Sequence, residues 1–153
     1  MPFLELMASI FHLAFPIGDV AIAKQFYVDG LGCTLGRESK QSVILGLQGH
    51  QLVGHVSTTE NDLQRGIYPR HFGLVFETEA EWKALRDCAL SHNLSFYQQP
   101  KHRFPGELLE HRTFFLQDPF GNLLEFKFYL HSEVILGARE FDRIGDQPAE
   151  AGG

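Results

Sequence analysis

Two histidines and one glutamate stand at matched places in two similar stretches of the chain. His12 opens the stretch His-Leu-Ala-Phe, and His71 opens the stretch His-Phe-Gly-Leu-Val-Phe. A later stretch, Gly-Asn-Leu-Leu-Glu-Phe, brings the carboxylate of Glu125. Two imidazoles and one carboxylate can bind a divalent metal on one side and leave the other side open to substrate. The pattern therefore predicts a metal site at His12, His71 and Glu125.

Strand alternation supports this grouping. Ala14 shares a strand face with His12, and Gly73 shares one with His71, so small side chains leave room beside both histidines. Taken alone, each histidine would be an ordinary polar strand end, and Glu125 could be an outward residue paired with Lys127. The metal interpretation comes from all three together, at equivalent positions of a repeat.

The first half of the chain predicts a strand, a helix and three further strands. The apolar run 10–17 is too short for a typical helix and is closed by proline and glycine, which favours a buried strand. Asp19 is a suitable N-cap for the helix that follows, and Gly30 and Gly32 end it. The next strands are expected at 33–39, 42–47 and 50–57, and Gly49 marks a hairpin between the last two.

The second half repeats this order after a polar linker at 58–69. A strand at 71–77 precedes a helix capped by Thr78, and strands are expected at 95–99, 112–117 and 123–130. The offset from His12 to His71 is 59 residues, a period that suggests duplication. We therefore expect an α+β protein of two βαβββ modules, 8–57 and 70–130, followed by a C-terminal extension at 131–153 whose end is disordered. The modules would pair into a curved, open half-barrel around a metal cleft.

Composition narrows the class of protein. The 153 residues are 44% hydrophobic and 21% charged, with a net charge of −6 when histidine is neutral. Neither nucleic acid nor an anionic membrane is expected as a partner, because both require a basic face. The two cysteines, Cys33 and Cys88, form no metal or redox motif and are expected as free thiols in a reducing cytoplasm. Acidic Glu5 and the lack of a basic run argue against a signal peptide.

Four segments taken together resemble the vicinal oxygen chelate superfamily, which includes glyoxalase I, fosfomycin-resistance enzymes and extradiol dioxygenases. They are HLAFPIGD at 12–19, FYVDGLG at 26–32, HFGL at 71–74 and DPFGNLLEF at 118–126. The resemblance covers about residues 8–130, and the strand sequences are most similar to those of bacterial proteins described as extradiol-dioxygenase-type. It implies metal ligands at His12, His71 and Glu125, and a homodimer.

The strand expected at 50–57 departs from the glyoxalase I pattern, which places a glutamate ligand there. This strand has no acidic residue, and Gln51 is the candidate fourth ligand through its carbonyl oxygen. The change favours a three-ligand site. His55 would share a face with Gln51 and precedes His71 by 16 positions, similar to the acid–base histidine of extradiol enzymes. Those enzymes also carry a tyrosine about ten residues before the ligand glutamate, where Phe115 stands in this chain.

Further candidates lie on the strand before Glu125 and the loop that precedes it. His111 and Arg112 could contact substrate, and the guanidinium of Arg112 could anchor a carboxylate or phosphate, although its position favours a solvated hairpin charge. The segment 101–107 is expected as a loop over the cleft mouth, where its cations could attract an acidic substrate.

The sequence thus predicts a metal-dependent oxidoreductase, favouring Fe(II) and an extradiol-dioxygenase-like reaction on a small molecule that chelates the metal through adjacent oxygens. A glyoxalase-like lyase or isomerase, or a thiol transferase, remains open and would use Ni, Zn or Mn instead. A non-catalytic, resistance-type binding protein is the third alternative. The sequence contains no phosphate-binding loop, dinucleotide fingerprint or nucleophile elbow that would point to other chemistry.

Overall fold

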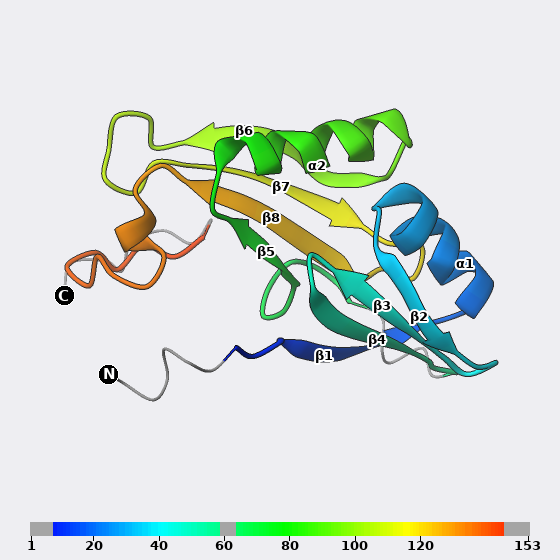
Figure 1. Cartoon of the computed structure of the whole chain (residues 1–153). Helices are drawn as coiled ribbons and strands as arrows, with labels where there is room; N and C mark the ends of the chain where they lie inside the picture. Colours follow the sequence, from blue (N-terminus) through cyan, green and yellow to red (C-terminus); the bar gives the residue numbers. More distant parts are fainter. Residues whose placement is uncertain (1–7, 59–63, 146–153) are drawn as a thin grey trace.

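The computed structural model describes residues 8–58 and 64–145, and these form two four-stranded sheets of the same design (Figure 1). The first sheet has the order β1-β4-β3-β2 and the second the order β5-β8-β7-β6. Strands β1 and β5 run parallel to β4 and β8, and the remaining pairs are antiparallel. The strands are β1 His12–Ile17, β2 Thr34–Glu38, β3 Ser42–Leu47, β4 His50–Val56, β5 Phe72–Phe76, β6 Phe96–Arg103, β7 His111–Gln117 and β8 Leu123–Tyr129.

Each sheet is crossed by one helical segment that begins at a side-chain cap. Asp19 accepts a hydrogen bond from the backbone N–H of Ile22 and starts α1, Val20–Lys24, which continues as the π-helical segment η2, Gln25–Gly30. Thr78 accepts from the N–H of Glu81 at the start of α2, Glu79–Ser91. The sequence pattern therefore located both helix starts.

One buried core joins both sheets and both helices. Tyr27 of η2 packs on Phe15 of β1, with ring centroids 5.4 Å apart, and Trp82 of α2 packs on Phe114 of β7 at 5.5 Å. The indole of Trp82 also donates a hydrogen bond to the carbonyl of Phe126. Because strand residues alternate, the residues next to these core side chains lie on the opposite face of each sheet, which the helices leave open. We call these the open faces.

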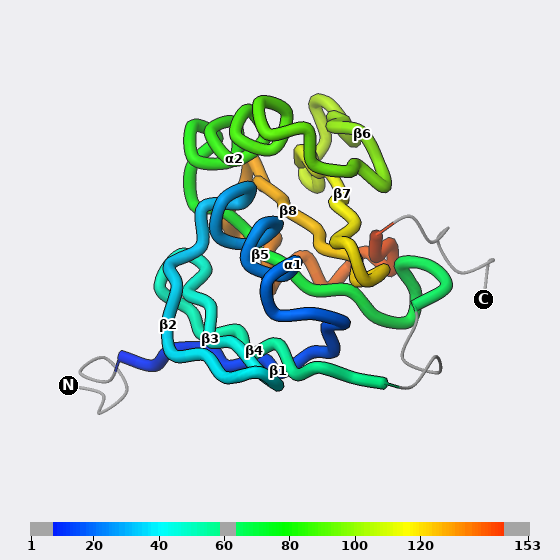
Figure 2. Tube along the Cα trace, turned by 90° about the vertical axis from the view of Figure 1, so that its right-hand side faces the viewer, coloured from blue at the N-terminus to red at the C-terminus, as the bar shows by residue number. Residues whose placement is uncertain are grey.

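The turn between β7 and β8 connects the two modules. The hydroxyl of Tyr27 donates to Asp118 Oδ2 at 2.7 Å, and Asn122 Nδ2 donates to the carbonyl of Pro16 at 2.8 Å. Burial raises the pKa of Asp118, although its hydrogen bonds to Tyr27 and Asn122 favour the charged form. These contacts orient one module relative to the other. The tube view shows α1 between the sheets, close to α2 (Figure 2).

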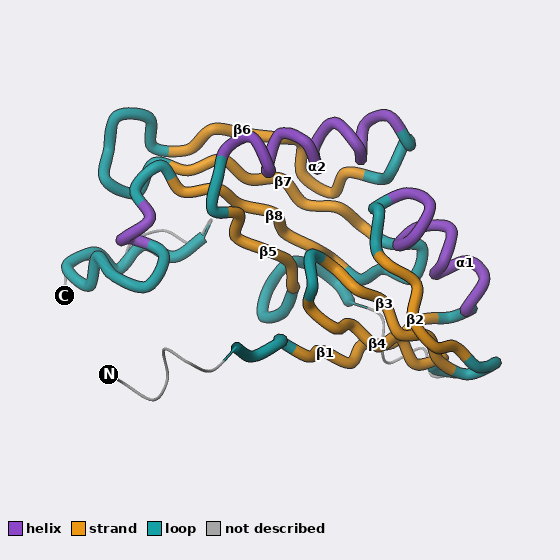
Figure 3. Tube along the Cα trace, in the orientation of Figure 1, coloured by secondary structure: helices purple, strands orange, loops and turns teal. Residues whose placement is uncertain are grey.

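The α+β fold of two repeated modules with open sheets is confirmed, with one difference in detail (Figure 3). Strand β6 continues through Arg103, where the sequence predicted a loop, because His102 and Arg103 pair with Arg112 and His111 of β7. In the described part of the chain no strand of one sheet pairs with a strand of the other, and neither sheet closes into a barrel. Residues 59–63 of the expected linker and 146–153 of the expected disordered end lie outside the described residues.

The segment after β8 extends the second module. It contains the short 3-10 helix η4, Ser132–Val134, and is described as far as Gly145. Among the residues that the structure describes, no helix is long and apolar enough to cross a membrane.

Candidate metal centre

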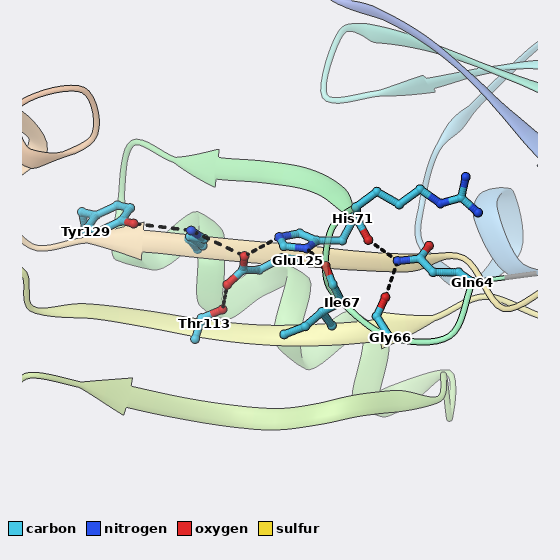
Figure 4. Close-up of polar contacts among 9 residues, drawn as sticks. Gln64, Gly66, Ile67, His71, Thr113, Glu125 and Tyr129 are labelled. Carbon is cyan, nitrogen blue, oxygen red and sulfur yellow. Dashed lines mark hydrogen bonds and ion pairs between the residues drawn. The ribbon is translucent and has the colours of Figure 1, made fainter. Parts of the chain in front are cut away.

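His71 and Glu125 form a close pair on the open face of the second sheet (Figure 4). His71 stands just before β5, and Glu125 lies in the middle of β8. Nε2 of His71 is 3.1 Å from Oε1 of Glu125. The side chain of Glu125 is 10% exposed and that of His71 25% exposed, so solvent reaches the pair from one side only. The structure thus brings together two of the three predicted ligands.

Both side chains are held by further hydrogen bonds. Nδ1 of His71 lies 2.6 Å from the carbonyl oxygen of Ile67, so Nδ1 carries the proton and Nε2 is directed towards the carboxylate. The hydroxyl of Thr113 donates to Oε2 of Glu125 at 2.6 Å. Metal-binding histidines in proteins are usually oriented through the second ring nitrogen in this way, and metal-binding carboxylates are hydrogen-bonded. Thr113 and Ile67 therefore fix the geometry of the pair.

Lys127 adds a positive charge beside the pair. Its Nζ is 3.5 Å from Oε1 of Glu125 and 3.4 Å from the hydroxyl of Tyr129. Burial favours the neutral form of Glu125, but the hydrogen bond with His71, the charge of Lys127 and the Thr113 hydroxyl outweigh it and lower the pKa of Glu125. The hydrogen bond to Glu125 raises the pKa of His71. Glu125 is therefore the anionic centre of this face.

Gly73 allows the edge strand to approach Glu125. A Cβ atom at Gly73 would collide with the backbone carbonyl of Glu125, its partner in the β5–β8 register. The sequence suggested that the small residue leaves room for a metal. The structure gives a more direct reason, since the space beside Gly73 is occupied by the backbone that carries the carboxylate.

Phe115, at the position where extradiol enzymes carry a tyrosine, packs beneath His71. Its ring centroid is 5.0 Å from that of the imidazole, and Phe115 is only 3% exposed. Ile67 and Leu123 join it in a small apolar cluster on the open face. Phe115 therefore contributes an apolar support for the histidine ring rather than a hydroxyl.

His12 belongs to the other sheet. It is exposed at the start of β1, where it pairs with Gln51 of β4 in register, and its Nδ1 lies 2.7 Å from Oε1 of Gln51. His55 lies four residues after Gln51, on the same open face, and is exposed. Within residues 8–58 and 64–145, no three His, Cys, Asp or Glu side chains form a group that could hold a metal. The single chain thus carries His12 apart from the pair His71 and Glu125.

The two candidates on β7 point to opposite faces. His111 lies on the open face, where Nδ1 is 2.8 Å from the carbonyl oxygen of Leu109 and the ring packs in a tilted contact on Tyr129, with centroids 4.9 Å apart. Burial, with smaller contributions from the charges of Lys127 and Arg103, lowers the pKa of His111. Arg112 lies on the helix-covered face, where its Nε is 2.6 Å from Oε1 of Glu79. The structure therefore brings His111 towards the site and takes Arg112 away from it.

Two contributors to the site were absent from the sequence prediction, which had already named Lys127 beside Glu125. Thr113 of β7 faces the same side as Glu125, and alternation along β7 together with its pairing to β8 was the signal that could have found it. The carbonyl of Ile67 had no such signal, because backbone groups of a linker leave no trace in residue type.

Comparison with known proteins places the chain in a family. The family model of the Glyoxalase/Bleomycin resistance protein/Dioxygenase superfamily matches residues 9–126. The chain belongs to this superfamily. A glyoxalase/bleomycin resistance protein/dioxygenase superfamily protein from Alicyclobacillus acidocaldarius is 41% identical, with a TM-score of 0.78 over 83% of this chain and 96% of that one. No curated protein sequence matches the chain.

More distant members of the superfamily share the fold. Lactoylglutathione lyase from Agrobacterium tumefaciens is 18% identical, with a TM-score of 0.59 over 80% of this chain and 95% of that one. A protein from Nocardioides that carries the three superfamily names is also 18% identical, with a TM-score of 0.58 over 81% and 85%. At this identity the likeness concerns the fold alone.

Members of this superfamily typically bind a divalent metal ion, and the described part of this chain brings two donors of the suitable kind together. Nε2 of His71 and Oε1 of Glu125 converge, and the partner atoms Nδ1 and Oε2 are engaged by Ile67 and Thr113. Likewise, the contact with Gln51 uses Nδ1 of His12 and leaves Nε2 for a ligand role. Neutral imidazole nitrogens and an ionised carboxylate are the forms that metals bind.

Proposed function

We propose that the protein is a metal-dependent, dioxygenase-like oxidoreductase whose complete site joins His71 and Glu125 of one copy to His12 of a second copy. The contact between His12 and Gln51 carries this proposal. The amide oxygen of Gln51 orients His12, so the donors that remain are two imidazoles and one carboxylate. This set, with open positions for substrate and dioxygen, suits Fe(II).

The open faces support completion by a second copy. His12 and the pair His71 and Glu125 lie on faces that the helices of the same chain leave uncovered. In the described residues β1 and β5 each form one edge of their sheet. Such edges are templates for pairing with another chain. The same region exposes Ile10 by 68% and Phe11 by 61%, as expected for a contact surface.

An apolar groove lies between these two edges. It has a volume of about 360 Å³ and is lined by residues that include Leu13 of β1, Leu52 of β4 and Leu74 of β5. A symmetric dimer formed along this groove would place β1 of one copy beside β5 of the other. His12 would then face the pair His71 and Glu125.

The residues near the candidate metal centre would have separate roles in the proposed reaction. A bound divalent ion would lower the pKa of the chelating substrate oxygens and stabilise charge on them. His111 is held with Nδ1–H on the carbonyl of Leu109, so its Nε2 can take a proton from a substrate hydroxyl. Lys127 stabilises the resulting anion, and Phe115 with Ile67 excludes water from one side. In the dioxygenase reaction both atoms of O₂ enter the product, so no external reductant is required.

Metal analysis tests the ligand set. We expect about one ion per chain after purification without chelator, and loss of that ion in His12→Ala, His71→Ala and Glu125→Ala. Arg112→Gln is a matched control on the covered face of β7 and should retain the metal. Equal metal content in wild type and Glu125→Ala would contradict the proposal.

Mixing two defective variants tests the shared site. If the site is formed between copies, co-expressed His12→Ala and Glu125→Ala chains yield mixed dimers that hold one intact site. About a quarter of the wild-type metal content should return. A site within one chain would regain nothing.

For the reaction, we expect oxygen uptake by the Fe(II)-loaded protein with one or more members of a panel of vicinal diols, including catechols. Iron that is demonstrably bound, with no uptake across the panel, would overturn the dioxygenase assignment.

A further inference from the structure

A cavity of about 370 Å³ lies on the open face of the second sheet, beside Lys127. His111, Lys127 and Tyr129 of the sheet form one wall, and the C-terminal segment 134–145 forms the other. In Figure 1 this segment, drawn in orange and red after β8, turns back along the side of the sheet away from α2. Lys127, whose Nζ is 3.5 Å from Oε1 of Glu125, lies between the cavity and the candidate metal centre and contacts both.

The cavity wall is cationic. Lys127, Arg139 and Arg143 line it, and none of the described residues that line it is Asp or Glu. The whole protein carries a net charge of −6, so the local positive charge of the cavity is opposite in sign to the net charge of the protein. The guanidinium of Arg143 lies 5.0 Å from the ring centroid of Phe104, and that of Arg103 also lies 5.0 Å from it. Several cations gathered around one hollow are favourable when an anion binds there.

The same cavity is lined by a cluster of aromatic and imidazole rings in tilted contact. The imidazole of His111 is 4.9 Å from the ring of Tyr129 and 5.8 Å from that of Phe104. Phe141 of the C-terminal segment adds a fourth ring to the lining. Aromatic surfaces favour stacked or edge contacts with another ring. A volume of this size is at the lower end of the range for small-molecule sites, which restricts the ligand to a compact molecule.

We propose that this cavity anchors an aromatic carboxylate, with its carboxylate on the arginine side and its ring packed against the ring cluster of Phe104, His111 and Tyr129. The inference rests on the proposed function, because it assigns the substrate class of that site. A carboxylate held by Arg139 and Arg143 would leave the opposite edge of the ring facing Glu125. The substrate is then an acid whose two adjacent oxygens lie at the end of the ring remote from the carboxylate.

Binding to the metal-free, full-length protein tests the anchor separately from the chemistry. Benzoate is the probe, benzyl alcohol its neutral counterpart, and inorganic phosphate an anion without a ring. By isothermal titration we expect benzoate to bind at least about tenfold more tightly than either of the others. Phosphate binding as tight as benzoate binding would overturn the aromatic part of the proposal. Equal binding of benzyl alcohol would overturn the anionic part.

Variants locate the binding. Arg143→Gln should weaken benzoate binding about tenfold, Arg139→Gln/Arg143→Gln should weaken it further, and Arg143→Lys should retain part of it. Arg37→Gln removes an exposed arginine of the other module and should change nothing. Metal content is measured separately, on portions of the same proteins purified without chelator. Arg143→Gln protein that keeps its metal and its benzoate affinity overturns the anchor. A wild-type chain that binds benzoate when metal-free but holds no metal when purified without chelator leaves the anchor standing and contradicts the proposed function.

Discussion

In the first sheet His12 contacts the neutral amide of Gln51, whereas in the second sheet His71 contacts the carboxylate of Glu125. The first pair is exposed and has no further support from the described chain. The second is held by Thr113 and Ile67 and lies beside Lys127, which also lines a cavity. Two modules with the same strand order thus surround their histidines differently. The second module carries the buried charges and the cavity, and the first carries an imidazole oriented by an amide.

The modules differ most sharply at the second residue after each histidine. Gly73→Ala places a methyl group against the backbone of Glu125 and should destabilise the protein by at least about 3 kcal/mol, because the backbone cannot move without disturbing β8. Urea unfolding monitored by circular dichroism gives the free energy of unfolding.

The matched change in the first module is Ala14→Gly. It removes a side chain from the open face and should cost no more than about 1 kcal/mol. Similar losses in the two variants would show that Gly73 has no special role in bringing β5 to Glu125.

The neutral amide of Gln51 is the second difference. Gln51→Glu gives the first module a carboxylate beside His12 and should increase the affinity for Zn(II) or Ni(II) by about 10- to 100-fold, since a further charged ligand joins the set. Competition with a chromophoric chelator measures the affinity.

Gln41→Glu adds the same charge in the exposed turn before β3 and is the control. If both variants bind metal as the wild type does, a carboxylate at position 51 does not reach the metal, and the first module contributes no fourth ligand.

A substitution at Thr113 should have a smaller effect on metal affinity, and it alters only the second module. Thr113→Val removes the hydrogen bond to Oε2 of Glu125 at nearly constant volume and should lower metal affinity about tenfold. Thr113→Ser keeps the hydroxyl and should stay close to wild type in the same assay. An unchanged affinity in Thr113→Val would mean that the carboxylate is positioned by His71 and Lys127 alone.

The smallest expected effect is that of a substitution on the helix-covered face of β7, which contrasts with the open face that carries the site. Arg112→Gln breaks an ion pair with Glu79 on the helix-covered face and should leave both metal content and benzoate affinity unchanged. A drop in benzoate affinity, measured by titration, would bring Arg112 back to the site as the sequence suggested.

Much of this arrangement could be predicted from the sequence. Apolar alternation located the strands, and the polar residues Asp19 and Thr78 located the helix starts, because these are local effects of side chain on backbone. The alternation around Glu125 also placed Lys127 on the correct face. Of the three residues that the repeat grouped, His71 and Glu125 do lie close together, because β5 and β8 are neighbouring strands of one sheet.

What escaped prediction depends on contacts between elements distant in the chain. Nothing in the residues around His12 shows that the helices fill the space between the sheets and leave the two halves of the site on separate faces. Arg112 was assigned to the wrong surroundings because its partner, Glu79, lies on a helix more than thirty residues away. Strand β6 extends beyond its expected end because pairing with β7 satisfies the hydrogen-bonding groups of its backbone, whatever the side chains are.

The stretch matched by the superfamily ends at residue 126, whereas the outer wall of the cavity comes from residues 134–145. The matched stretch thus contains the histidine and the carboxylate, whereas the outer wall of the cavity lies beyond it. Replacement of the C-terminal segment would therefore change the shape and charge of the cavity while leaving His71 and Glu125 in place.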